Sequence, residues 1–368
     1  MEIDHVHFYV ENAIQWRDWF VHYLGFQAIA TTSDHETCTA VVNSNSTDFL
    51  LSSPLTPESP VAQFLQKHPP GVADIAFRVR NLDWAIAQAI KAGTKLLQPI
   101  QVNLGLKWAK ILGWGDLCHT LIEVNEPQQL AMFSGEPTIF CSYVGKNNPT
   151  VPFQMISHID HIVLNVASGE LPRAVNWYQK ALGFQARQTF KIRTEYSGLS
   201  SQVLVSDRVT LPINEPTSAN SQIQEFLNIN HGSGIQHIAL HTDKIIKSVH
   251  QMRCRGLSFI DVPMNYYDRL RERKQLNLSD RQWQSIKAEK ILVDWQSEKP
   301  KALLMQTFTK PIFNQPTFFF EIISRKKNAK GFGEGNFHAL FEAVEREQFK
   351  RERMVNLEKC KKPIADYC

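Results

Sequence analysis

The sequence predicts an α+β protein built from four βαβββ modules, two in each half of the chain. Two internal repeats support this prediction. The segment IDHVHFYVENAIQWRDWFVHYLGFQA, residues 3–28, recurs as IDHIVLNVASGELPRAVNWYQKALGFQA, residues 159–186. The segment that begins GVADIAF at residue 71 recurs as GIQHIAL from residue 234, at about the same offset. Repeats at a shared offset indicate a duplicated half.

Each repeated unit has the pattern of a strand, a helix and then further strands. Apolar residues recur at helical spacing on one face, namely Ala13, Trp16, Phe20 and Leu24 in the first copy and Ala174, Tyr178, Ala181 and Leu182 in the second. Gly25 and Gly183 follow where each helix is expected to end. Runs such as SQVLVSDRVTLPIN and ALLMQTFTK are rich in the β-branched and apolar residues typical of short strands.

Two segments fit the repeat less well. HTLIEVNE, around Glu123, aligns weakly with TFFFEIISR, around Glu321. Residues 264–300 have no partner in the first half and are predicted to be an insertion near the mouth of the C-terminal module. Within it, Ser279 and Gln282 form a candidate capping box for a helix that runs toward Ile291.

Length and composition indicate two soluble globular domains. The 368 residues exceed the roughly 150 typical of one domain, and Pro, Gly and Asn accumulate over residues 136–154. We therefore predict domains at 1–150 and 151–368. Forty basic against 36 acidic residues leave a net charge of +4 without a long basic block, so neither nucleic acid nor a membrane surface is an expected partner.

Nothing in the sequence predicts export or membrane insertion. No apolar run approaches the roughly 18 residues of a spanning helix, and the start MEIDHVHFYV lacks the basic region of a signal peptide. The six cysteines form no CxxC pair and are too sparse for a disulfide framework. We expect a cytoplasmic protein with reduced cysteines.

Three polar residues interrupt apolar strands of the second half at equivalent places in the modules. They are His161 in IDHIVLNV, His237 in GSGIQHIAL and Glu321 in TFFFEIIS. Burying such groups is costly unless they are paired or bound to a metal ion. Two imidazoles and one carboxylate form the facial triad of non-haem Fe(II) oxygenases, which leaves coordination positions open for substrate and dioxygen. Either histidine, taken alone, is better explained as a hydrogen-bonded core residue, whereas the three together at equivalent positions favour a metal site.

Longer motifs then point to a family. They are LPINEP at 211–216, SQIQEFL at 221–227, GSGIQHIAL at 232–240, QTFTKP at 306–311, FFEII at 319–323 and GFGEGNFHALFE at 331–342. In order and spacing the chain resembles the 4-hydroxyphenylpyruvate dioxygenase family, of the vicinal-oxygen-chelate superfamily, over nearly its whole length. The resemblance implies two open-barrel domains, the first for structure and assembly and the second catalytic. It also implies one Fe(II) per chain, held by His161, His237 and Glu321, and a homodimer or homotetramer.

The activity implied by this resemblance is conversion of 4-hydroxyphenylpyruvate to homogentisate and carbon dioxide. It combines oxidative decarboxylation, ring hydroxylation and side-chain migration, with dioxygen as co-substrate. Because the 2-oxo acid substrate supplies its own electrons, 2-oxoglutarate is not expected. Homogentisate serves either tyrosine breakdown or quinone and tocopherol synthesis, and both stay open. Two alternatives remain: 4-hydroxymandelate synthase, which oxidises the benzylic carbon of the same substrate, and a non-catalytic binder of small molecules with the same fold.

Matching motif to motif extends the resemblance to the substrate pocket. It implies that Ser201, Asn214 and Gln222 surround the phenol end of the substrate and that Gln236 and Gln306 flank the chelating end. Aromatic walls are implied at Phe308, Phe319, Phe332 and Phe337, with Asn336 and Leu340 as further substrate contacts. Gln236, Gln306 and Phe337 are the candidates for a catalytic role. Each aromatic residue has the plainer alternative of core packing.

The GFGEGNF segment precedes a helical pattern in which Phe337, Leu340, Phe341 and Val344 share one apolar face. It lacks the Lys and Ser/Thr of a phosphate loop. The helix is either a packing element or, as the family suggests, a lid that closes the iron pocket and excludes water. The resemblance implies that mandelate-forming relatives carry a smaller aliphatic residue at the position of Phe337, so we expect attack on the ring and not on the benzylic carbon.

The first half retains a trace of the same site. The repeats align His5, Asp74 and Glu123 with His161, His237 and Glu321, so that a histidine and two acids are expected near one another. The family uses only the C-terminal site, and we do not expect a second metal ion.

Overall fold

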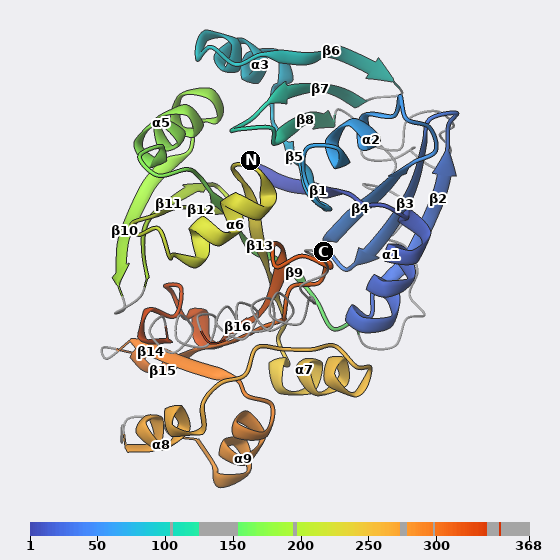
Figure 1. Cartoon of the computed structure of the whole chain (residues 1–368). Helices are drawn as coiled ribbons and strands as arrows, with labels where there is room; N and C mark the ends of the chain where they lie inside the picture. Colours follow the sequence, from blue (N-terminus) through green and yellow to red (C-terminus); the bar gives the residue numbers. More distant parts are fainter. Residues whose placement is uncertain are drawn as a thin grey trace, which may run out of the picture.

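The computed structural model describes residues 1–103, 106–124, 154–193, 197–272, 278–296, 299–336 and 346. Two eight-stranded mixed sheets dominate it (Figure 1). The first sheet has the order β2-β3-β4-β1-β5-β8-β7-β6. Its strands are β1 Glu2–Tyr9, β2 Gln27–Ser33, β3 Thr37–Ser44, β4 Thr47–Pro54, β5 Gly71–Arg78, β6 Leu96–Asn103, β7 Leu106–Leu112 and β8 Cys118–Val124.

The second sheet repeats this order strand for strand, as β10-β11-β12-β9-β13-β16-β15-β14. Its strands are β9 His158–Asn165, β10 Gln185–Arg193, β11 Gly198–Ser206, β12 Val209–Pro216, β13 Gly234–His241, β14 Leu292–Gln296, β15 Lys299–Phe308 and β16 Phe319–Arg325. In both sheets the two central strands, β1 with β5 and β9 with β13, are antiparallel, and each of them is parallel to its outer neighbour. The prediction of four βαβββ modules is confirmed.

A helix follows the first strand of each module, namely α1, α3, α5 and α7, and further helices lie in the connections between and after the strands. They are α1 Ala13–Trp19 with the π-helical turn η1 Phe20–Leu24, α2 Pro60–Leu65, α3 Leu82–Lys91, α5 Leu171–Leu182, α6 Gln222–Asn230, α7 Ile245–Cys254, α8 Met264–Glu272, α9 Asp280–Ala288 and the 3₁₀ turns η3 Lys326–Asn328 and η4 Glu334–Asn336. Gly25 and Gly183 end their helices in the left-handed region, both at φ 71°. That conformation is costly for residues with a Cβ atom, so the helix ends follow from the sequence.

The insertion is shorter than the sequence analysis predicted. The capping box of Ser279 and Gln282 is present and begins α9. However, β14 pairs with β15 as β6 pairs with β7, so the end of the segment 264–300 has a counterpart in the first half. Only α8, α9 and their connections are extra, and they lie at the outer edge of the second sheet (Figure 1).

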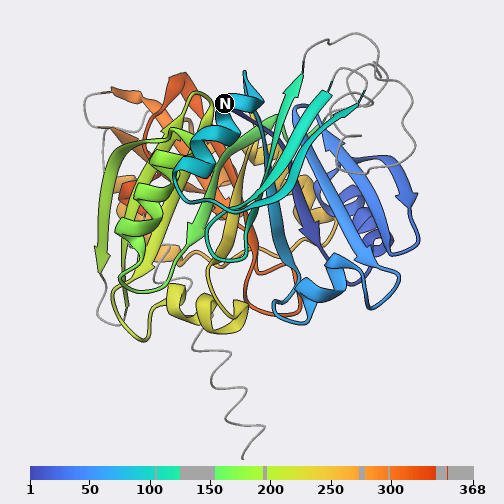
Figure 2. The ribbon, with the colours of Figure 1, turned by 90° about the horizontal axis from the view of Figure 1, so that it is seen from above.

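The apolar core continues from one half of the chain to the other. From above, the two curved sheets lie side by side (Figure 2). The ring of Phe320 on β16 lies 6.0 Å from that of Phe49 on β4 and 6.5 Å from that of Phe8 on β1. Because successive side chains of a strand face opposite sides, Phe320 points into this shared core and its neighbours Phe319 and Glu321 point into a cavity of the second half.

Some predictions fall outside the described residues. These are the domain boundary at residue 150 and the helix with Phe337, Leu340, Phe341 and Val344. Among the helices of the described part, none combines the length and hydrophobicity required to span a bilayer.

A buried hydrogen bond also joins the halves. Nε2 of His119 on β8 lies 3.0 Å from the hydroxyl of Tyr178 on α5, and Nδ1 lies 3.2 Å from the carbonyl of Ile75. A carbonyl only accepts, so Nδ1 donates and Nε2 accepts from Tyr178. Burial lowers the pKa of His119 to about 4, against the opposing charge of Asp74.

This contact predicts a pH effect on stability. Since His119 titrates near its ordinary value when unfolded and near 4 when folded, protons bind preferentially to the unfolded chain below that ordinary value. The stability is complete at neutral pH and is lost as the pH falls toward 4. The native protein should lose unfolding free energy between pH 7.5 and pH 5, and His119→Gln should make that loss smaller by roughly 2 kcal/mol. Thermal unfolding at both pH values measures this, with the exposed His35→Gln as control. An equal loss in His119→Gln and the native protein would contradict the assignment.

Candidate active site

Three neighbouring strands at the centre of the second sheet carry the predicted metal ligands. His161 lies on β9, His237 on β13 and Glu321 on β16. In the sheet register His161 and Glu321 are both level with Ala239, which lies between them on β13. Residues at the same level share a face of the sheet. Since Ala239 has only a methyl group, the two longer side chains can meet across it.

The three side chains converge on one carboxylate oxygen. Oε2 of Glu321 lies 3.3 Å from Nε2 of His161 and 3.8 Å from Nε2 of His237. In the part of the chain that the structure describes, this is the only group of three or more potential ligands whose atoms all lie within 4.8 Å of one another. Oε1 of Glu321 has no hydrogen-bond partner among the described residues. A buried carboxylate oxygen without a partner is costly, and a cation held by this group would satisfy it.

The surroundings give the two imidazoles different protonation. Burial lowers the pKa of His237 well below its ordinary value, and the charge of His161 lowers it further. Burial also lowers the pKa of His161, but the carboxylates of Glu321 and Asp160 outweigh it and raise the pKa to about 9. His237 is therefore neutral and ready to donate a lone pair. Cation binding must displace a proton from His161, as is usual for ligand groups.

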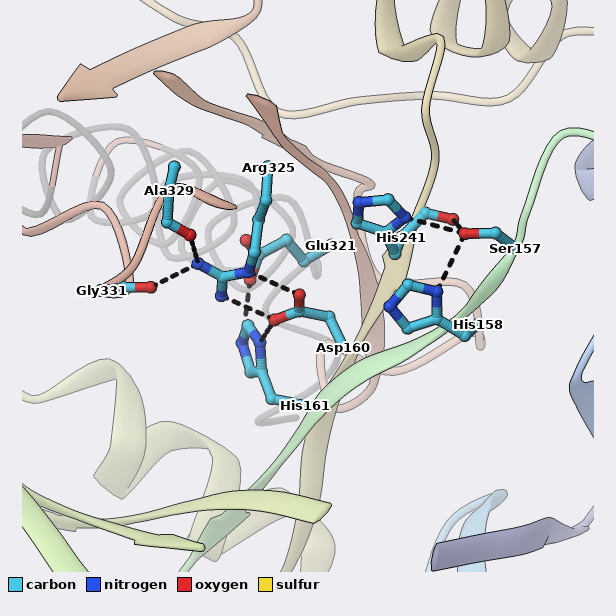
Figure 3. Close-up of polar contacts among 9 residues, drawn as sticks. All are labelled: Ser157, His158, Asp160, His161, His241, Glu321, Arg325, Ala329 and Gly331. Carbon is cyan, nitrogen blue, oxygen red and sulfur yellow. Dashed lines mark hydrogen bonds and ion pairs between the residues drawn. The ribbon is translucent and has the colours of Figure 1, made fainter. Parts of the chain in front are cut away.

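A second layer of residues orients His161 (Figure 3). Its Nδ1 lies 2.8 Å from Oδ1 of Asp160, which in turn accepts hydrogen bonds from Arg325. Burial alone would raise the pKa of Asp160, but the hydrogen bonds from Arg325 and His161 hold it far below its ordinary value. Asp160 is thus a carboxylate that fixes the proton of His161 on Nδ1 and leaves Nε2 facing Glu321.

The triad forms one wall of a cavity of about 100 Å³. Most of the predicted substrate residues line it: Ser201, Asn214, Gln222, Gln236, Gln306, Phe308, Phe319 and Phe332. Ser201, on β11, is directly opposite Asn214, on β12, and both are buried. They do not face solvent.

One predicted contact differs, and two are not tested. Asn336 is buried but does not line the cavity, and its Oδ1 accepts a hydrogen bond from Tyr266 of α8. Phe337 and Leu340 lie outside the described residues.

The sequence analysis missed the apolar residues that complete the wall, namely Val163, Phe190, Ile192, Leu199, Val203, Pro212 and Ile223. Strand alternation was a usable signal for some of them. Val163 is two residues from His161, and Leu199 and Val203 are each two residues from Ser201. Asp160 and Arg325 were also missed, although the repeated IDH motif marks the first of them.

Comparison with known proteins assigns the chain to a family. A model of the hydroxyphenylpyruvate dioxygenase N-terminal domain matches residues 1–133, and a model of the glyoxalase/bleomycin resistance protein/dioxygenase superfamily matches residues 158–276. The 4-hydroxyphenylpyruvate dioxygenases of Yarrowia lipolytica and Dictyostelium discoideum are each 37% identical to this chain. The alignments cover 95% and 94% of this chain and 92% and 97% of those proteins. The chain belongs to the 4-hydroxyphenylpyruvate dioxygenase family.

Two further comparisons extend over the same length. An uncharacterized protein of Synechocystis sp. is 33% identical to this chain. The alignment covers 94% of this chain and 97% of that protein. The solved structure of a mutant 4-hydroxymandelate synthase from Streptomyces coelicolor superposes with a TM-score of 0.80 at 26% identity, and covers 94% of this chain and 98% of that one. The vicinal-oxygen-chelate fold predicted from the sequence is confirmed.

In this member of the dioxygenase family the first half departs from the predicted alignment. Asp74 is level with Cys118 as His237 is level with Phe319. The position equivalent to Glu321 is therefore Thr120, and the alignment with Glu123 is wrong by three residues. The carboxylate of Glu123 instead accepts a hydrogen bond from the backbone N–H of Leu82 at the start of α3. The error arose because the weak third repeat was aligned on its acidic residue and not on strand register.

An ammonium group occupies the interior of the first half. Lys110 on β7 is level with Thr120, as Phe308 is level with Glu321. Its Nζ lies 3.1 Å from Oδ2 of Asp74, while the backbone N–H and the hydroxyl of Thr120 donate to the same carboxylate. Burial would raise the pKa of Asp74, but Lys110 and Thr120 lower it overall. The carboxylate that replaces His237 is thus neutralised by a side chain of the protein.

This arrangement predicts that Lys110 stabilises the first half by neutralising Asp74. Lys110→Met leaves a buried carboxylate without its cation and should cost about 3 kcal/mol of unfolding free energy. Adding Asp74→Asn should restore most of the loss. The control is Lys107→Met on the same strand, whose partner Asp83 is exposed and whose loss should cost less than about 1 kcal/mol. Equal stability of Lys110→Met and Lys107→Met in denaturant titration would refute the role of the ammonium.

Proposed function

We propose that this protein is an Fe(II)- and O2-dependent enzyme that converts 4-hydroxyphenylpyruvate to homogentisate and carbon dioxide. The observation that carries the proposal is the convergence of His161, His237 and Glu321 on the wall of a cavity lined by uncharged hydrogen-bonding and aromatic side chains. Family membership supports it, because relatives similar over nearly the whole chain are named for this activity.

The triad would hold one Fe(II) ion per chain. Two neutral imidazoles and a carboxylate are the ligand set of non-haem Fe(II) oxygenases, and a bound cation would satisfy Oε1 of Glu321, which has no hydrogen-bond partner among the described residues. When bound, Fe(II) supplies the Lewis acidity and the electron transfer needed for reaction with dioxygen. Asp160 holds one proton of His161 on Nδ1, so the proton that a cation displaces is the one on Nε2.

The polar residues of the cavity would orient the substrate. We assign the phenol end to Ser201, Asn214 and Gln222, since a hydroxyl can both donate to and accept from such groups. The amide of Asn214 already donates to Asn165, 3.4 Å away, which restricts its orientation. A site built to bind a hydroxyl rejects analogues that lack it. Gln236 and Gln306 would serve the 2-oxo acid end.

The charges of the cavity fit a 2-oxo acid that binds at the metal ion. None of the described residues that line the cavity is Lys or Arg, and His161 loses its proton when a cation binds at the triad, so no cationic side chain among them then pairs with the substrate carboxylate. The cation at the triad is left as its partner. Phe308, Phe319 and Phe332 would enclose the aromatic ring and exclude water from the reacting groups.

The overall reaction balances without a further reductant. One molecule of substrate and one of dioxygen contain all the atoms of homogentisate and carbon dioxide, and the substrate is the electron donor. We therefore expect dioxygen as the co-substrate and no 2-oxoglutarate. In this proposal residues 151–368 are catalytic, residues 1–150 serve structure and assembly, and the protein forms a homodimer or homotetramer.

A second candidate is 4-hydroxymandelate synthase activity on the same substrate. The close superposition with such an enzyme favours it. A difference of about 1.4 kcal/mol between the barriers for ring and benzylic attack changes the product ratio tenfold, so one side chain can decide the outcome. We propose that the bulk of Phe337 directs attack to the ring.

Product analysis tests the proposal. Protein loaded with Fe(II) under anaerobic conditions is mixed with 4-hydroxyphenylpyruvate and oxygen, and the products are separated by chromatography. We expect homogentisate from the native protein and a mixture with 4-hydroxymandelate from Phe337→Ile, at a lower total rate. Only 4-hydroxymandelate from the native protein would establish the second candidate. Substrate binding without turnover would instead indicate a non-catalytic binding protein.

A further inference from the structure

Arg325 is the most extensively bonded side chain near the triad, and neither the proposed reaction nor the ligand set assigns it a role. It lies on β16 four residues beyond Glu321. Its Nε and Nη2 donate to the two oxygens of Asp160, at 2.6 and 2.7 Å. Its Nη1 donates to the backbone carbonyls of Ala329 and Gly331, at 3.2 and 2.7 Å. One guanidinium thus holds a side chain of β9 and a turn after β16 (Figure 3).

Asp160 connects this network to the triad. Its Oδ1 accepts from Nδ1 of His161 at 2.8 Å, and the other nitrogen of that ring faces Glu321. The orientation of the imidazole therefore depends on where Asp160 is held. A bidentate pair with a planar guanidinium fixes a carboxylate in both position and rotation. A lysine at the same place would fix it only as a point charge.

The turn held by Arg325 also reaches the triad. Gly331 is followed by Phe332, whose ring contacts that of His161 edge-on at a centroid distance of 5.3 Å. Gly333, at φ 78°, lies so close to Gln306 that a Cβ atom there would be 2.3 Å from Oε1 of Gln306. His161 is therefore restrained at Nδ1 through Asp160 and on its ring through Phe332, and both restraints are held by Arg325.

We propose that Arg325 is a positioning residue that sets the orientation of His161 for metal binding and couples it to the turn containing Phe332. The inference rests on the proposed metal-binding function of the triad and deepens it. Loss of the guanidinium releases Asp160 and the carbonyl of Gly331 together, so the imidazole loses both restraints. Metal affinity should fall because a ligand that must be ordered on binding binds more weakly.

The first half contains a natural control. Arg78 forms an ion pair with Asp4, and Oδ1 of Asp4 lies 2.7 Å from Nδ1 of His5. The arginine, carboxylate and imidazole are thus the same three groups as in the second half. In the described chain His5 does not belong to a group of potential metal ligands. Arg78→Met therefore removes an equivalent ion pair without touching the triad.

The test is a titration of the purified full-length protein with Co²⁺ against a competing chelator. Four variants are compared with the native chain: Arg325→Met, Arg325→Lys, Asp160→Asn and Arg78→Met. Arg325→Met and Asp160→Asn should raise the Co²⁺ dissociation constant about 10- to 100-fold. Arg325→Lys, which keeps the charge, should fall between these and the native protein. Arg78→Met should stay within about twofold of the native value, because it removes an equivalent ion pair that does not contact the triad.

A second readout separates positioning from stability. The visible absorption of bound Co²⁺ reports the arrangement of its ligands, and it should change in Arg325→Met and not in Arg78→Met, although both lose an ion pair. Circular dichroism shows whether each variant is folded. If Arg325→Met does not fold, the comparison of Arg325→Lys and Asp160→Asn with Arg78→Met still tests the proposal. Equal dissociation constants and spectra in the Arg325, Asp160 and Arg78 variants would overturn the proposal. That result would leave homogentisate formation by the native protein unaffected, so the two failures are distinguishable.

Discussion

The structure of the second half depends on how two imidazoles and a carboxylate are buried together on one face of a sheet. Glu321, His161 and His237 would be costly in an apolar interior if they were unrelated. Their strands are adjacent, and Ala239 between two of them leaves room for a contact of 3.3 Å between Glu321 and His161. Strand alternation sends Phe320, next to Glu321, into the core shared with the first half. The same strand thus supplies a polar site on one face and the junction between the halves on the other.

The two halves neutralise their buried polar groups at equivalent positions in different ways. In the second half, acidic and imidazole groups face a cavity, which suits an exchangeable cation and a substrate. In the first half, Asp74 replaces the second histidine, Thr120 replaces the glutamate, and Lys110 brings a covalently attached cation to Asp74. Both halves keep an aspartate beside the first histidine and an arginine paired with that aspartate. This contrast supports the proposal that only the second half is catalytic.

Much of this organisation could be predicted from the sequence, because the repeats preserve apolar spacing. The modules, the helix ends at Gly25 and Gly183 and the capping box at Ser279 depend on local patterns. The features that were missed depend on register and long-range contact. Thr120 matches Glu321 only when strands are paired in space, β14 has little sequence similarity to β6, and the bonds from Arg325 to Asp160 span 165 residues. Lys110 resembles a surface lysine until its partner is known.

An anaerobic Fe(II) titration shows whether the triad holds one iron ion per chain, as we propose. The native protein, Glu321→Ala and His5→Ala are titrated in parallel, since His5 is the repeat equivalent of His161. We predict one equivalent of tightly bound Fe(II) in the native protein and in His5→Ala, and its loss in Glu321→Ala with the fold retained. Stoichiometric iron in Glu321→Ala, or none in the native protein, would contradict the account.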